Sequence, residues 1–183
     1  MLKNIFGRHK DNKSADKTKE KTVISEFIGW LKDNKWNVIS KEEKAGIGSN
    51  EVLRNFKNLP LTWKNLAEQY SIIENEGQTV CFLCAADYNA KPDGEFQWNE
   101  FETISLNAAI GDAKWAEEIK KWWSDKLPIV MSVRNGYSFY AIDTGKGKGA
   151  IIRGQEPEFE DAKAVAEDFD SFLKKVIGGD IAL

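Results

Sequence analysis

The two cysteines of the chain, Cys81 and Cys84, form a Cys-x-x-Cys pair, a spacing found in zinc sites and redox-active dithiols. The surrounding run TVCFLC favours a strand, in which side chains three residues apart point to opposite faces. A second ligand pair is missing, and the one histidine, His9, lies in a polar N-terminal stretch. We therefore interpret the pair as buried, inert thiols and expect no metal and no cofactor.

The glycine-rich segment TGKGKG, Thr144–Gly149, has some features of a phosphate-binding loop. Such a loop requires Gly-x-x-x-x-Gly-Lys-Ser/Thr between a strand and a helix, so that backbone N–H groups face the anion. Here Gly149 follows Lys148, and strands are predicted on both sides. We interpret the segment as a connection between strands, with no nucleotide site.

Nucleophilic catalysis needs a serine or cysteine beside a base, and His9 is poorly placed to be that base. Carboxylate pairs stay open as acid–base groups, because the chain has 29 acidic residues. No catalytic residue is predicted, and we expect a protein that is not an enzyme and has no small-molecule substrate.

Length and composition favour one soluble domain, since 183 residues with 42% hydrophobic and 30% charged residues can bury a sizeable core. The N-terminus lacks the apolar region of a secretory signal, and no run approaches the roughly 18 apolar residues of a membrane span. These features predict a cytoplasmic protein.

The net charge of −3 is unevenly distributed. Residues 1–22 carry seven bases and three acids, and we expect a basic, flexible tail there, with a single domain over residues 23–183. From Gly154 to Asp170 there are seven acids and one base. A concentrated negative surface attracts a basic protein and repels nucleic acid, although a solvated helix face explains the same charges.

The candidate partner-binding residues are therefore acidic and aromatic. Adjacent helical residues point about 100° apart, so two neighbouring tryptophans in a predicted helix are not both expected to be buried, and one could contact a partner. The predicted binding residues are Glu156, Glu158, Glu160, Glu167, Asp170, Trp122 and Trp123.

The periodicity predicts helices first, then mostly antiparallel strands with one inserted helix, then a closing helix. This is an α+β class, with a mostly antiparallel sheet and helices packed on one face. Helices are expected at about 24–31, 50–58, 62–73, 113–123 and 161–177. Strands are expected at 79–86, 96–106, 128–133, 137–143 and 150–153, with hairpin turns at Asp93-Gly94 and Asn135-Gly136.

The order of these segments resembles the SUKH superfamily, which groups bacterial immunity proteins with fungal regulators of cell-wall assembly and glucan synthesis. The matching landmarks, between about Ser49 and Val176, are Leu59-Pro60 followed by WKNLAEQY, a second LPI at 127–129, GYSFYAID at 136–143, GAII at 149–152 and VAEDFDSFL at 165–173. In this family an Asn-Gly commonly follows the first Leu-Pro helix; here Glu74–Gly77 stands in its place, and Met1–Lys44 has no counterpart.

The resemblance implies a non-catalytic domain that neutralises a cognate polymorphic toxin, often a nuclease, by direct binding. Nuclease toxins are usually basic, which agrees with the acidic segment. The alternative is a regulatory or scaffold protein related to the cell-wall-assembly regulators, whose basic tail contacts a membrane or nucleic acid. Leu2, Ile5 and Phe6 make only a short apolar patch in that tail, so any membrane contact would be weak.

Overall fold

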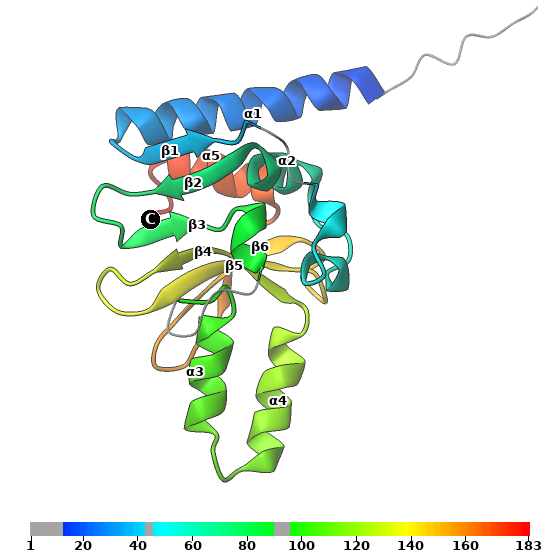
Figure 1. Cartoon of the computed structure of the whole chain (residues 1–183), viewed down its shortest axis with the longest axis vertical. Helices are drawn as coiled ribbons and strands as arrows, with labels where there is room; N and C mark the ends of the chain where they lie inside the picture. Colours follow the sequence, from blue (N-terminus) through cyan, green and yellow to red (C-terminus); the bar gives the residue numbers. More distant parts are fainter. Residues whose placement is uncertain (1–12, 43–45, 90–95) are drawn as a thin grey trace, which may run out of the picture.

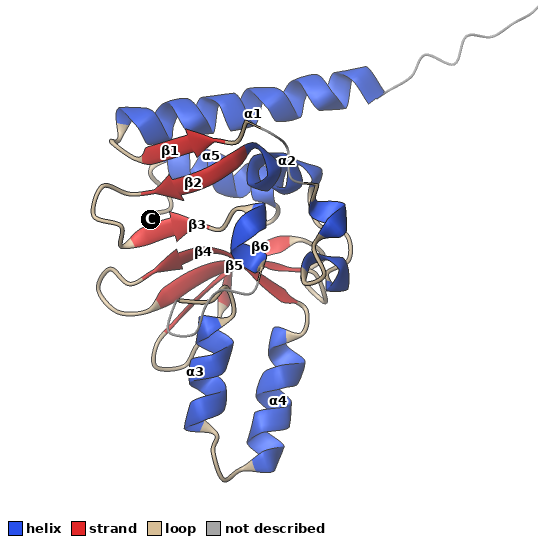
Figure 2. Ribbon diagram, viewed as in Figure 1, coloured by secondary structure: helices blue, strands red, loops and turns tan. Residues whose placement is uncertain are grey.

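The computed structural model describes residues 13–42, 46–89 and 96–183. Its centre is a seven-stranded sheet, and Figures 1 and 2 show how the helices lie around it. Neighbouring strands are antiparallel, and they follow one another in chain order from β1 to β7. The strands are β1 (Asn37–Ser40), β2 (Tyr70–Glu74), β3 (Val80–Phe82), β4 (Lys126–Ser132), β5 (Ser138–Asp143), β6 (Ala150–Gln155) and β7 (Lys163–Ala166). The predicted α+β class with an antiparallel sheet is confirmed.

Helices lie on both faces of the sheet, so the expectation of helices on a single face is not confirmed. The helices are α1 (Lys13–Asp33), α2 (Leu61–Gln69), α3 (Glu100–Ala108), α4 (Ala113–Trp123) and α5 (Phe169–Gly178). Adjacent residues of β5 point to opposite faces. Tyr140 packs on Phe172 of α5, whereas Phe139 packs on Phe101 of α3 and Trp123 of α4.

The second face has its own aromatic core, in which Phe139, Phe101 and Phe159 have ring centroids 5.0 to 6.3 Å apart. Gly154 of β6 lies directly beneath it. A Cβ at this position would stand 2.5 Å from ring atoms of Phe139 and 2.6 Å from the carbonyl oxygen of Phe159. The loop between β6 and β7, which contains Phe159, therefore approaches the sheet so closely that position 154 requires glycine.

The hairpin predicted at Asn135-Gly136 is confirmed. It joins β4 to β5, and both residues have positive φ, at 64° and 96°. The inserted helix α4 and the strand β6 also lie where the sequence predicted them.

The strand predicted over residues 96–106 is wrong, because Glu100–Ala108 forms α3. Its buried residues Phe101 and Ser105, together with Ala109, recur every four residues, which is helical spacing. The proposed turn at Asp93-Gly94 lies outside the described residues.

The closing helix begins later than predicted. Residues 163–166 form β7 on β6, and α5 starts only at Phe169, where the Asp168 carboxylate accepts a 2.7 Å bond from the backbone N–H of Ser171. Within the range 50–58, where a helix was predicted, the chain forms only the short 3₁₀ turn Leu53–Asn55, and a second such turn, Ile47–Ser49, precedes it. The helix predicted over 62–73 ends at Gln69, and the chain then continues as the strand β2.

Helix α1 crosses the predicted boundary between tail and domain at residue 22. It begins at Lys13, and Val23, Phe27 and Leu31 are among its residues that reach the core. Residues 1–12 of the predicted tail lie outside the described residues. No helix in the described ranges is long and apolar enough to cross a membrane.

Candidate protein-binding site

The predicted acidic residues belong mainly to the loop between β6 and β7, the last two strands of the sheet. Glu156, Glu158 and Asp161 line a groove of about 580 Å³ together with Arg153 and Lys163. We call this feature the acidic groove. Its three carboxylates are exposed, and they outnumber its two bases.

Two contacts fix the position of this loop. The backbone N–H of Glu156 donates to the carbonyl oxygen of Tyr137 at 2.9 Å, and the Glu156 side chain lies over Gly136 of the β4–β5 turn. A Cβ on Gly136 would stand 2.5 Å from the carboxylate oxygen Oε1 of Glu156, and the φ of 96° at this position itself favours glycine. Phe159, 2% exposed, anchors the middle of the loop in the aromatic core. The exposed acids therefore project from a rigidly attached loop.

Glu160 points inward and does not line the acidic groove. Its Oε1 accepts a 2.6 Å hydrogen bond from the indole Nε1 of Trp123, which is only 4% exposed. This bond joins the loop to α4. Both residues were predicted to contact a partner, and the structure places them in a contact within the protein.

Glu167 and Asp170 do not line the acidic groove; they flank the start of α5. Asp170 lies in the first turn of the helix, where the partial positive charge of the helix N-terminus stabilises a carboxylate. Glu167 is exposed at the end of β7. These two acids extend the negative surface along the chain without sharing the groove.

Trp122 is half-buried and lines a different cleft, of about 520 Å³. The ammonium of Lys126 lies 5.2 Å from the centre of its ring, within the range of a cation–π contact. Ala162 lines this cleft, whereas its neighbours Asp161 and Lys163 line the acidic groove. The alternation places Trp122 and the acidic groove on opposite sides of the β6–β7 hairpin.

The glycine-rich loop, Thr144–Gly149, packs on the carboxylates of Asp125 and Asp143. The sequence pattern did not predict these contacts. Lys126 pairs with Asp125 and, at 3.3 Å, with Asp143. The backbone N–H of Gly145 donates to Asp143 at 3.0 Å, and a Cβ on Gly145 would overlap the Asp125 carboxylate. These contacts, together with β5 and β6 on either side, support the interpretation of the segment as a strand connection.

Cys84 is buried, and burial, followed by the nearby Asp87 carboxylate, raises the pKa of its thiol to about 12. At neutral pH it is therefore protonated and a poor nucleophile or metal ligand. Within the described ranges, no group of three or more His, Cys, Asp or Glu side chains is placed to hold a metal ion.

Comparison of the chain with protein-family models and with curated proteins finds no match.

Proposed function

We propose that this chain is a non-catalytic protein-binding domain that captures a basic protein through the acidic groove. The observation that carries the proposal is the exposure of Glu156, Glu158 and Asp161 on a loop whose neighbours are fixed in the core. Preformed charge on a rigid loop needs little ordering when a partner binds, and it accelerates the encounter with a protein of opposite charge.

We propose further that the partner is a toxin, such as a nuclease domain, and that binding neutralises it. The support for this step is the resemblance of the segment order to the SUKH superfamily, whose bacterial members include immunity proteins. An inhibitor that covers the positive, nucleic-acid-binding surface of a nuclease competes with nucleic acid for it, and an acidic groove is suited to that task.

The test is coexpression of this chain with the toxin domain encoded beside its gene. We expect growth to be restored and the two proteins to co-purify at low salt. If growth is not restored and no complex forms, the immunity function is wrong for that pair.

A charge-reversal pair shows whether the acidic groove is the binding surface. E156K/E158K changes the groove, whereas E26K/E76K makes the same change in net charge at exposed positions on α1 and the β2–β3 turn. We expect the groove variant to lose rescue and the control to keep it. Equal rescue by both variants would move the binding surface elsewhere.

A further inference from the structure

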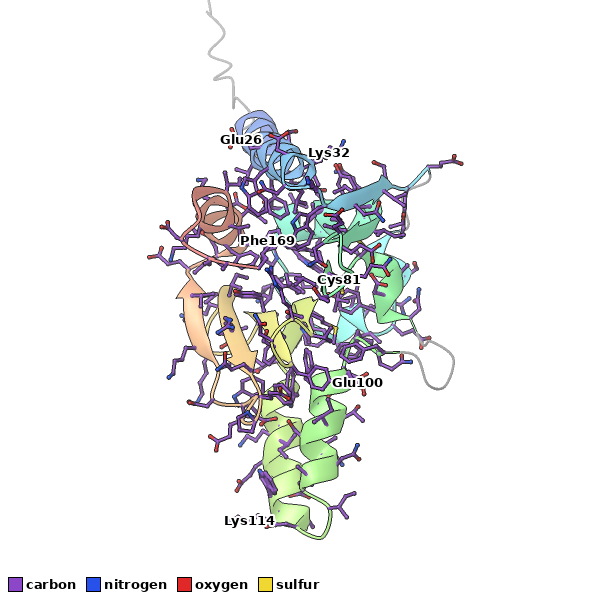
Figure 3. All side chains as sticks on the ribbon, turned by 90° about the vertical axis from the view of Figure 1, so that its left-hand side faces the viewer. Glu26, Lys32, Cys81, Glu100, Lys114 and Phe169 are labelled. Carbon is purple, nitrogen blue, oxygen red and sulfur yellow. The ribbon has the colours of Figure 1, made fainter. Side chains whose placement is uncertain are left out.

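The α3–α4 hairpin projects from the sheet (Figures 1 and 3). Apolar side chains lie near its tip. Gly111, with φ of 96°, forms the tight turn, and Asp112 caps α4 by accepting a 3.0 Å bond from the backbone N–H of Trp115. Ile110 is 80% exposed, more than the other large apolar side chains of the described ranges. This turn is therefore held in a defined shape while it presents an isoleucine to solvent.

One flank of the hairpin is hollowed beside this isoleucine. The hollow has a volume of about 510 Å³, and we call it the hairpin hollow. Its apolar lining comprises Leu106, Ala109, Ile110, Ala113 and Ala116. α4 also contributes two charged residues to the lining of the hollow. Asp112, at the N-terminal end of α4, is negative, and Lys120, in its last turn, is positive.

We propose that the hairpin hollow binds the same surface of a second copy of this chain, so that the protein forms a two-fold symmetric dimer. Ala113, Ala116 and Lys120 share one side of α4, at positions i, i+3 and i+7. The distance between the axes of two packed helices is usually about 8–10 Å, and alanine at the contact allows a distance at the short end of this range.

The charge pattern of α4 is self-complementary in this arrangement. Ala116 lies four residues from Asp112 and four residues from Lys120. When two α4 helices cross antiparallel at Ala116, Asp112 of one copy faces Lys120 of the partner subunit, and symmetry repeats the pair. A surface that matches itself under a two-fold rotation is the requirement for an isologous dimer.

Ile110 supplies the apolar part of the contact. It protrudes beside a hollow lined by alanines, so each copy offers both a projecting side chain and a recess. Two hairpins packed in this way form a four-helix arrangement, in which short loops connect antiparallel helices. The dimer does not depend on the acidic groove or on the proposed toxin.

The first test is disulfide trapping in a C81S background. With a two-fold axis at Ala116, the A116C variant should form an intermolecular disulfide on mild oxidation. The matched control is K114C, at a position whose lysine side chain is 88% exposed, on another side of α4. Efficient cross-linking of A116C alone supports the dimer; no cross-link at A116C, or equal cross-linking of both variants, overturns it.

The second test is the mass in solution, measured by sedimentation over a range of concentrations. The unmodified chain should dimerise, and I110K should weaken association by at least about tenfold, since it places two lysines in an apolar contact. I39K makes the same substitution at an exposed isoleucine of β1 and should leave the dimer unchanged. A monomeric mass at every concentration, or equal effects of the two variants, contradicts the proposal.

Discussion

The hydrogen bond between Trp123 and Glu160 distinguishes Glu160 from the exposed acids of the acidic groove. Glu158 and Glu160 are two residues apart in one loop, but Glu158 is exposed whereas Glu160 accepts the 2.6 Å indole bond. We therefore expect E160A to destabilise the fold and E158A to leave it nearly unchanged. For association with a basic partner, E158A should have the larger effect.

The magnitude follows from the chemistry of the bond. A hydrogen bond to a charged group contributes roughly 1.5–3 kcal/mol, and this one is only partly buried, which favours the lower end. E160A should lower the free energy of unfolding by about 1.5 kcal/mol, equivalent to a fall in Tm of roughly 3–6 °C for a chain of this size. W123F should cost about 2–3 kcal/mol, because it also shrinks a buried ring.

The assay is urea denaturation of the two single variants and the double variant. Because W123F and E160A remove the same bond, their effects should fall short of additivity by about 1 kcal/mol. E158A is the control, with an expected change within about 0.5 kcal/mol. Additive effects, or an E160A variant as stable as E158A, would refute the inward role of Glu160.

Three further predictions concern the core and its ionisable groups. G154A should destabilise the protein by about 2 kcal/mol or more through overpacking, whereas G29A, in an open position within α1, should stabilise it by roughly 0.5–1 kcal/mol; thermal unfolding compares them. Burial raises the pKa of Glu102 above its ordinary value of 4.5; Lys120 opposes this shift and Glu160 reinforces it. The native state therefore binds the Glu102 proton more tightly than the unfolded chain does. The protein loses stability as the pH rises from the ordinary pKa through the raised native pKa. E102Q should thus stabilise the protein more at pH 7 than at pH 4, and the opposite order in denaturant titrations would contradict this sign. In a C81S variant, Cys84 should react with a thiol reagent at pH 8 only after unfolding.

The sequence predicted the elements that are determined by neighbouring residues, such as a tight turn or an amphipathic helix. Asn135-Gly136 marks a hairpin because both residues readily adopt positive φ, and the spacing of apolar residues in 113–123 marks a helix. The short strand β7, with the sequence KAVA, has a composition that also suits a helix. Its pairing with β6 decides its conformation, and no local pattern carries that information.

The site depends still more on long-range contacts. Trp123 and Glu160 are 37 residues apart, so nothing near either one indicates that they meet. The pair Lys126 and Asp143 was closer to being predictable, because Asp143 ends one strand of the predicted hairpin and Lys126 lies two residues before the other, predicted over 128–133. Counting outward from a two-residue turn would pair Lys126 with Gly145, but the longer turn and the bulge between Pro128 and Val130 shift its partner to Asp143.

Capture of a basic protein by the acidic groove is tested most directly by the association rate constant with that partner. We expect E156K/E158K to slow association by at least about tenfold at low salt, E26K/E76K to slow it much less, and the difference to shrink as salt is added. Equal rate constants for the two variants at low salt would contradict capture through the acidic groove.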